Sequence, residues 1–318
     1  MSINWKTLVD NLSTNACVPF LGAGASLPIL PSGEDLAAEL MARSNVLGPY
    51  PFQPASDLKR VAQYVAALND DVPATKRIVE AIIRERASAD ASCLPRIHRT
   101  LARLRLPVYM TTNYDLLLEQ ALRAEGCEPI VEVCRWSPDL LESKPSRFDE
   151  SNFQPTPQRP VVFHLHGAIG AGSDSLVVTE DDYLDFLLNV SRELSSAPAT
   201  SSERIALPLP LRRAIRNQPL LFVGYSLTDI NFLFILRALA SKLEPHRRVQ
   251  RVAVQLSPKA LPAGDDLGSY QARVEKYFAW TYEGVSVLWT DADGLAARLE
   301  AQLPVRPTGD APRDAFAP

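Results

Sequence analysis

The sequence predicts an α/β protein with a Rossmann-like, doubly wound parallel sheet and a helical insertion subdomain. Short apolar runs alternate with amphipathic helical patterns along most of the 318 residues. The apolar runs are nearly continuous, which is typical of strands that are buried on both faces of a parallel sheet. Hydrophobic residues make up 46% of the chain, which is enough for one large domain with a sizeable core.

Each expected strand is a short apolar or β-branched run bounded by turn-forming residues. These runs are Cys17–Leu21, Pro107–Thr111, Val161–Leu165, Pro219–Val223, Arg251–Gln255 and Val285–Trp289. Helical periodicity predicts covering helices at Tyr114–Arg123, Asp181–Val190, Asp229–Lys242 and Ala292–Leu303. In a sheet of this kind, ligands bind at the carboxyl ends of the strands, so the functional residues are expected there.

The interval between the first two strands is much longer than a βαβ crossover needs. It holds four helical patterns, at Gly33–Arg43, Asp57–Leu68, Thr75–Arg86 and Leu94–Leu104. We therefore expect a helical insertion at about 33–105, within a single domain that covers 1–304. Residues 136–160 are rich in Ser, Pro and charge and are expected to form a surface loop, and the Pro-rich residues 305–318 a disordered tail.

Composition excludes several classes of protein. The formal net charge is −4, without the basic footprint of a nucleic-acid binder, so no direct nucleic-acid binding is expected. The first residues do not have the pattern of a signal peptide and no apolar run is long enough to span a membrane, so neither feature is expected. Four cysteines without a C-x-x-C pair predict neither a metal site nor a disulfide scaffold, and favour a cytoplasmic protein with reduced thiols.

The first strand ends in a small-residue loop, Gly22-Ala23-Gly24-Ala25-Ser26. Glycines without a Cβ let a phosphate approach the backbone N–H groups, and Ser26 adds a hydroxyl. The loop lacks the third glycine of G-x-G-x-x-G and the G-K-[ST] ending of an ATPase loop. The alternative is a tight turn whose glycines serve packing alone.

The second strand ends in Thr111-Thr112-Asn113-Tyr114-Asp115. Asn113 is a favoured residue for an N-cap, and Asp115 suits the first turn of the helix that follows. In the functional interpretation, Asn113 points its amide into the cleft. There it would donate to and accept from sugar hydroxyls or a water. On the sequence alone, capping and this functional role are about equally favoured.

The third strand carries two histidines, His164 and His166, which alternation places on the same side of the sheet. His164 lies deeper and is interpreted as a core residue. His166 comes directly before Gly167 at the strand exit, where it would meet solvent and ligand, and it is the candidate general base. Two histidines without cysteine or carboxylate spacing make a poor metal site.

A fourth strand ends in Gly224-Tyr225-Ser226, which again combines a glycine with a hydroxyl and would complete a phosphate or ribose site opposite the first loop. In the predicted sheet, all four strand ends would fall along one edge. Together they supply phosphate donors, sugar-binding polar groups and a single base, but no cysteine nucleophile and no carboxylate pair. The chemistry that fits is on the sugar of a nucleotide rather than hydride transfer.

In this order, the motifs G-A-G-x-S, T-x-N-x-D, H-G and G-x-S resemble those of the sirtuin superfamily, over roughly Val18 to Trp289. The zinc module of protein-deacylating sirtuins is absent, and no arginine follows the first loop. The stretch Leu176–Leu187 resembles divergent bacterial sirtuin-like effectors, many of which hydrolyse NAD in anti-phage defence. The resemblance thus implies an NAD+ glycohydrolase that cleaves the nicotinamide–ribose bond to nicotinamide and ADP-ribose, with NAD+ as substrate and no metal.

The resemblance also implies roles for the candidate residues. Gly22, Ala23, Gly24, Ser26, Thr112, Gly224 and Ser226 would bind NAD+, with the pyrophosphate on the two glycine loops. Asn113 would orient the ribose or the attacking water, His166 would act as the base, and Asp115 would hold Asn113 or bind the ribose.

Effectors of this kind work with partners, so the resemblance implies a homo-oligomer and an activating partner such as a HerA-type hexameric ATPase or an Argonaute. Two alternatives remain open. One is a zinc-free NAD-dependent protein deacylase, which would consume NAD only together with an acyl peptide. The other is a non-catalytic NAD or ADP-ribose sensor in a defence complex.

Overall fold

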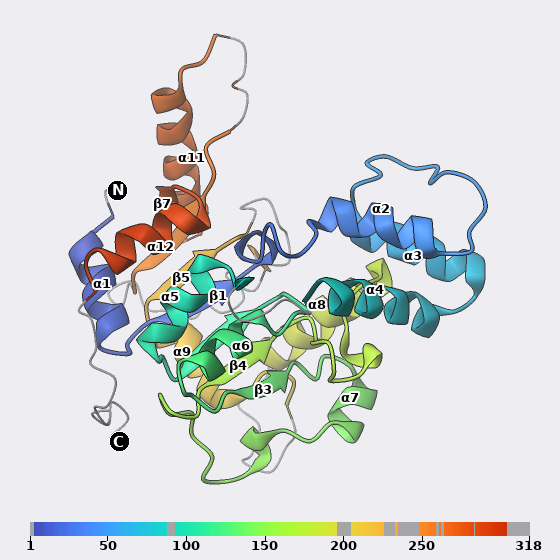
Figure 1. Cartoon of the computed structure of the whole chain (residues 1–318), viewed down its shortest axis with the longest axis horizontal. Helices are drawn as coiled ribbons and strands as arrows, with labels where there is room; N and C mark the ends of the chain where they lie inside the picture. The colour runs from blue at the N-terminus through green and yellow to red at the C-terminus, as the bar shows by residue number, and fades with distance from the viewer. Residues whose placement is uncertain are drawn as a thin grey trace.

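Within the part of the chain that the structure describes, a seven-stranded, all-parallel sheet forms the centre, in the order β3-β4-β2-β1-β5-β6-β7 (Figure 1). The structure is a computed structural model that describes residues 3–87, 93–195, 205–225, 233–234, 249–258, 261, 264–282 and 284–303. The strands are β1 (Val18–Leu21), β2 (Val108–Thr111), β3 (Ile130–Val133), β4 (Val161–His164), β5 (Leu220–Val223), β6 (Arg251–Gln255) and β7 (Val285–Trp289). The Rossmann-like fold expected from the sequence is confirmed.

Successive strands are placed first on one side of β1 and then on the other. After β1 the chain adds β2, β3 and β4 on one side, and it then returns to the other side with β5, β6 and β7. The carboxyl ends of β1 and β5 therefore form the topological switch point, where ligands of open α/β sheets bind. All six strands expected from the sequence are present, but β3 was not expected.

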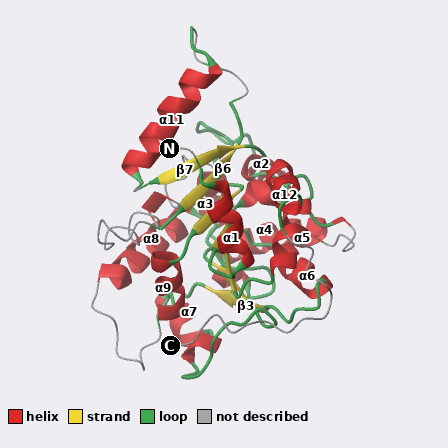
Figure 2. Ribbon diagram, turned by 90° about the vertical axis from the view of Figure 1, so that its left-hand side faces the viewer, coloured by secondary structure: helices red, strands yellow, loops and turns green. Residues whose placement is uncertain are grey.

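Helices cover both faces of the sheet (Figure 2). One face packs against α1 (Trp5–Ser13), α5 (Arg96–Leu104), α6 (Leu117–Ala124) and α12 (Ala292–Glu300). The other face packs against α8 (Glu180–Ser195), α9 (Leu209–Asn217) and α11 (Leu267–Thr281). Alternate strand residues supply the two faces: Val162 belongs to the first core cluster and Phe163 to the second. The helix expected at Asp229–Lys242 and the expected tail at 305–318 lie outside the described residues, except for residues 233–234.

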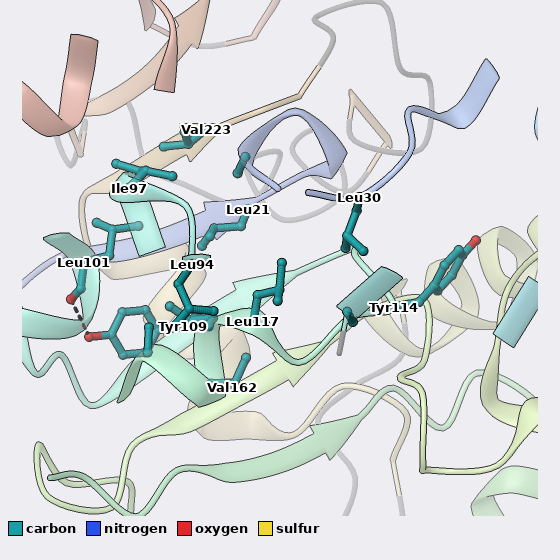
Figure 3. Close-up of a cluster of buried hydrophobic side chains, with 14 of the residues drawn as sticks. Leu21, Leu30, Leu94, Ile97, Leu101, Tyr109, Tyr114, Leu117, Val162 and Val223 are labelled. Atoms are coloured by element: carbon teal, nitrogen blue, oxygen red, sulfur yellow. Dashed lines mark hydrogen bonds between the residues drawn. The ribbon is translucent and has the colours of Figure 1, made fainter. Parts of the chain in front are cut away.

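In the first core cluster, side chains of α5 and α6 pack directly on those of the central strands (Figure 3). Leu21 and Val223 face Ile97 and Leu117 across this cluster, which is fully or almost fully buried. The hydroxyl of Tyr109 donates to the carbonyl of Leu101 over 2.9 Å, so its polar atom is satisfied inside the core. Burying each of the larger side chains stabilises the fold by about 1.5–3 kcal/mol.

The helical insertion expected at about 33–105 separates into two parts. The helices α2 (Gly33–Arg43), α3 (Leu58–Asn69) and α4 (Val72–Ala87) pack on one another to the side of the sheet (Figure 1). The helix α5 instead packs on α6 and α12, as part of the layer that covers the sheet. The part of the insertion that stands apart is therefore α2 to α4.

A buried ion pair fastens α4 to the N-terminal end of α8. Lys76 Nζ lies 2.7 Å from Asp182 Oδ1, with side chains that are only 7% and 9% exposed. The other carboxylate oxygen accepts from the backbone N–H groups of Val178 and Thr179. Because all these donors converge on one carboxylate, the insertion and α8 are held in one fixed arrangement.

The segment expected to be a surface loop, residues 136–160, is partly helical. It contains α7 (Pro138–Ser143) and a short 3₁₀ helix, Arg147–Asp149, each preceded by a capping serine. The buried Arg135 guanidinium forms a bidentate pair with Asp149, at 2.7 and 2.8 Å. Two serines of this segment, Ser137 and Ser146, therefore cap helices, and its charged residues include a partner for a buried arginine.

The four cysteines form no disulfide; three of them are buried and Cys93 is exposed. Burial raises the pKa of the Cys17 thiol well above its usual range, which makes it an unreactive packing group. Across the described residues, no helix is long and apolar enough to cross a membrane. In the same part of the chain, no three His, Cys, Asp or Glu side chains are grouped so that they could hold a metal ion.

Candidate active site

The loops that follow β1 and β5 touch each other backbone to backbone at the switch point. Gly22 N donates to Val223 O over 2.8 Å, and Gly24 N donates to Gly224 O over 3.0 Å. A Cβ at Gly224, whose φ is +79°, would lie 2.2 Å from Ala25 N. A Cβ at Gly22 would lie 2.7 Å from Gly224 O. Glycine is therefore required at these positions by the close approach of the two loops.

Much of the glycine loop's own N–H capacity is used within the protein. Ala25 N donates to Gly22 O, and Ser26 N donates to Ala23 O. Ala23 is exposed, and its N–H makes no hydrogen bond to any described residue. Packing thus accounts for the glycines, whereas Ala23 N–H is the donor left for a ligand. Ser226, the last residue of the fourth motif, lies outside the described residues.

The last carbonyl of β1 ties three neighbouring strand ends together. Leu21 O accepts from Thr111 Oγ1 over 2.9 Å, from Thr112 N over 3.1 Å and from the Tyr225 hydroxyl over 2.9 Å. The Thr112 hydroxyl in turn donates to the Tyr225 hydroxyl over 3.2 Å. The single proton of Thr112 is thereby engaged, so a ligand would meet this hydroxyl as an acceptor.

Asn113 is held in one orientation by the glycine loop. Its amide Nδ2 donates to Gly22 O over 3.1 Å and to Ser26 Oγ over 3.0 Å. Because a carbonyl can only accept, Nδ2 must be the atom that faces Gly22. The amide oxygen then has no hydrogen-bond partner among the described residues, and it is available to accept from a water or a sugar hydroxyl.

The alternative in which Asn113 caps the next helix is wrong. The helix α6 begins at Leu117, several residues later than the sequence pattern predicts, and the side chain that accepts from the Leu117 N–H is that of Asp115, not Asn113. The short connection between β2 and α6 is instead occupied by the groups that contact the glycine loop. The sequence pattern missed this boundary because Asn and Asp favour helix starts and ligand-facing turns alike.

Asp115 connects the glycine loop to the start of α6. Its Oδ2 accepts from Ser26 Oγ over 3.1 Å, and its Oδ1 accepts from Leu117 N over 3.0 Å. Burial, assisted by the charge of Glu119, raises the pKa of Asp115 to about 6 despite these hydrogen bonds and the nearby His164. Ser26 therefore lies between Asp115 and Asn113 and bonds to both side chains.

His166 lies at the exit of β4, but it does not meet solvent as expected. The side chain is only 3% exposed, and its ring makes edge contacts with Tyr183 and Phe186 of α8, each with centroids 5.1 Å apart. Strand alternation does not continue to His166, because β4 ends at His164 and the chain turns there. The expectation that both histidines face the same side is wrong: their rings contact helices on opposite faces of the sheet.

His164 is buried as expected, and it is also bonded to the candidate site. Nδ1 lies 2.9 Å from Asn113 O, and Nε2 lies 2.7 Å from Glu119 Oε1. Burial lowers the pKa of His164, but the Glu119 carboxylate and the two hydrogen bonds outweigh it, and the net shift is upward. Glu119 was not expected from the sequence, although a carboxylate on the apolar face of a predicted helix was a signal for it.

Most of the candidate residues therefore form one hydrogen-bonded group with the loops that pack on it, and His166 lies at the end of the adjacent strand. Gly22, Ser26, Asn113 and Asp115 are joined by hydrogen bonds, and Gly24, Gly224 and Thr112 lie in the loops that pack beside them. The β2 and β4 strands pair Thr111 with His164, so Asn113 and His166 each follow two residues after this pair. An amide oxygen, a polar loop and an imidazole thus occupy the edge of the sheet where ligands bind.

A family model described as a SIR2-like domain matches residues 107–279, more than half of the chain. Three curated relatives are each named NAD(+) hydrolase ThsA. The protein from Acinetobacter baumannii (strain 532279) is 26% identical over 270 residues, which is 85% of this chain and 48% of the relative. The protein from Bacillus cereus (strain MSX-D12) is 28% identical over 61% of this chain and 34% of the relative.

The third, from Cytobacillus dafuensis, is 30% identical over 57% of this chain and 30% of the relative. The chain thus spans half or less of the length of these relatives. The family match contains Asn113, Asp115, His166 and Gly224, and it begins after the glycine loop of β1. The resemblance to sirtuin-like proteins is confirmed, and the chain belongs to the SIR2-like family.

Proposed function

We propose that the chain is an NAD+ glycohydrolase that cleaves the nicotinamide–ribose bond to nicotinamide and ADP-ribose, with NAD+ as its substrate. The observation that carries this proposal is the orientation of Asn113. Gly22 O and Ser26 Oγ hold its amide nitrogen, so that the amide oxygen is presented as an acceptor at the switch point of the sheet. The names of the three relatives support the same reaction.

The chemistry follows from the groups present. The bond between the nicotinamide nitrogen and ribose C1′ breaks with both electrons going to nicotinamide, which is a good leaving group because its ring nitrogen is cationic. A water oxygen then bonds to C1′, and the water loses a proton. Asn113 Oδ1 would accept a hydrogen bond from this water or from a ribose hydroxyl, and His166 would accept the proton. A positioned base of this kind contributes about 10²–10⁴-fold to the rate.

The two glycine loops would bind the pyrophosphate of NAD+. Their glycines bring the backbones of the β1 and β5 ends together, and Ala23 N–H offers a donor at the exposed side. Thr112 and Ser226 would add polar contacts to the ribose or the phosphates. Asp115 would act through Ser26, which it bonds directly, on the placement of Asn113.

The role in the cell is proposed from the resemblance to anti-phage effectors. We infer a cytoplasmic protein that depletes NAD+ during infection, assembles as a homo-oligomer, and is activated by a partner such as a HerA-type ATPase or an Argonaute. The four cysteines form no disulfide, which agrees with a reducing compartment. Light scattering of the protein alone and with each partner tests the proposed homo-oligomer and the proposed complexes.

The reaction itself is tested by incubating the purified protein with NAD+ and following nicotinamide and ADP-ribose by chromatography. Asn113→Ala and His166→Ala should each lower the release at least about 10²-fold. Asn189→Ala is the matched control, because the Asn189 amide donates to Trp136 O and, among the described residues, bonds to none of the candidate site residues. This control should cleave NAD+ like the wild type.

The alternatives give different results in the same assay. A zinc-free deacylase releases nicotinamide only when an acyl-lysine peptide is present, and a sensor binds NAD+ without turnover. Calorimetric binding of NAD+ with no product, alone or with a partner, would therefore overturn the proposed reaction.

A further inference from the structure

His164 and Glu119 form a polar pair in the interior of the protein, and His164 contacts the main chain of Asn113. Both side chains are 0% exposed, and His164 Nε2 lies 2.7 Å from Glu119 Oε1. His164 is the last residue of β4 and is paired with Thr111 on one side and Val133 on the other. Its other ring nitrogen, Nδ1, lies 2.9 Å from the carbonyl of Asn113.

The two contacts determine where the protons of the pair lie. The Asn113 carbonyl can only accept, so His164 Nδ1 must carry a proton. The short contact between Nε2 and Oε1 then requires a second proton between them, because otherwise two acceptors would face each other. Whether that proton belongs to the imidazole or to the carboxyl, the pair has no net charge, and the Nδ1 donor remains in place.

Packing alone does not explain this pair. Glu119 Oε2 is buried and has no hydrogen-bond partner among the described residues, which is unfavourable. Apolar side chains of similar volume would fill the space between β4 and α6 at least as well. What the polar pair adds is a fixed donor to the main chain of Asn113.

We propose that His164 and Glu119 are positioning residues for Asn113. Glu119 fixes the tautomer of His164, and His164 clamps the Asn113 carbonyl. The glycine loop holds the amide from the other side, through Gly22 O and Ser26 Oγ. Asn113 is thus restrained at both its main chain and its side chain, and its amide oxygen is kept facing the substrate. This role rests on the proposed cleavage of NAD+.

The first experiment determines the protonation state of the His164–Glu119 pair in the absence of substrate. Histidine labelled with ¹⁵N in its ring reports tautomer and protonation by NMR in the free protein. We expect His164 Nδ1 to stay protonated between pH 5 and 9, with its signal assigned by its loss from a His164→Phe/Glu119→Leu variant. A neutral His164 protonated on Nε2 alone would overturn the proposal, because no donor would then reach Asn113.

The second experiment separates positioning from stability. The double variant His164→Phe/Glu119→Leu removes the clamp but leaves an apolar core, so that no buried charge is stranded. We expect kcat for NAD+ to fall about 10–100-fold with KM nearly unchanged. Glu119→Gln is the conservative control, because its amide donates to Nε2 and keeps Nδ1 protonated; it should retain kcat close to that of the wild type.

The third arm repeats the double variant in an Asn113→Ala background. If the pair acts through the Asn113 side chain, the residual kcat should fall no further. An equal fold-loss in both backgrounds would show a general structural effect and overturn the proposal. Failure of the wild-type protein to cleave NAD+ would refute the proposed function instead, and the NMR result would still decide the state of the pair.

Discussion

The Ser26 hydroxyl and the Asp115 carboxylate, 89 positions apart in the sequence, are joined by a 3.1 Å hydrogen bond in the buried interior of the candidate site. Ser26 also accepts from Asn113 Nδ2, so one hydroxyl joins an acid to an amide. A substitution of Asp115 should therefore alter the placement of the Asn113 amide, and a substitution of Asn113 should alter the surroundings of Asp115.

Replacing Asp115 should reveal the energetic cost of its charge. The pKa of Asp115 is raised from 3.8 to about 6 in the folded protein. Its favourable contribution is therefore complete below about pH 3.8 and is lost as the pH rises through about 6. Asp115→Asn should accordingly raise stability at pH 8, by at most about 3 kcal/mol, and much less at pH 4. Urea unfolding at the two pH values measures the difference, and equal effects at both would contradict it.

Ser26→Ala should impair catalysis more than stability. The variant leaves Asn113 Nδ2 with Gly22 O alone and removes the hydroxyl donor from Asp115, so we expect kcat to fall about 10–100-fold. Ser32→Ala is the matched control, because Ser32 caps α2 in a capping box. It should cost about 1 kcal/mol of stability but leave NAD+ cleavage unchanged. The reverse pattern, with activity lost only in the Ser32 variant, would refute the assignment.

Gly224→Ala tests the contact between the two loops. Gly284 has a similar φ, +85°, but a Cβ there would have no atom within 4 Å, so Gly284→Ala measures the backbone strain alone. That strain should cost about 1–2 kcal/mol. Gly224→Ala should cost about 1–3 kcal/mol more, because its Cβ would collide with Ala25 N. Thermal unfolding of both variants checks this, and equal losses would mean that the loops separate freely.

Lys76→Met should loosen the attachment of the helical insertion to α8. Removing one partner of a buried ion pair costs about 3–5 kcal/mol, and Asp182 keeps two backbone donors, so we expect the lower end of this range. Arg60→Met is the control, because its pair with Glu180 is largely exposed, and it should cost less than about 1 kcal/mol. Hydrogen exchange should become faster in the first turns of α8 in the Lys76 variant only.

Six of the strands were predictable because each lies in a largely apolar run bounded by turn-forming residues. The exception is β3, Ile130–Val133, which contains the buried carboxylate of Glu132. Ser146 Oγ and Arg147 N each donate to this carboxylate over 2.7 Å, and both come from a segment later in the sequence. A charged residue whose partners are supplied by tertiary contacts breaks the local pattern, so the sequence alone hid the strand.

The candidate site shows the same limit. The positions of Gly22, Asn113 and Asp115 at strand ends followed from the alternation of strands and helices. The direction of the Asn113 amide did not, because it depends on a carbonyl from a different strand. The burial of His166 against Tyr183 likewise depends on where β4 ends and how α8 lies, which no local pattern encodes.

Three of the acceptors that shape the site are main-chain carbonyls, those of Leu21, Gly22 and Asn113. A main-chain acceptor is supplied by the path of the backbone, whatever side chain the position carries. To transplant this arrangement into another parallel sheet, a designer would need to reproduce that path and then add only the donors: a threonine and a tyrosine for the first carbonyl, an asparagine for the second and a histidine for the third. The acceptors of these four hydrogen bonds would thus come with the scaffold itself.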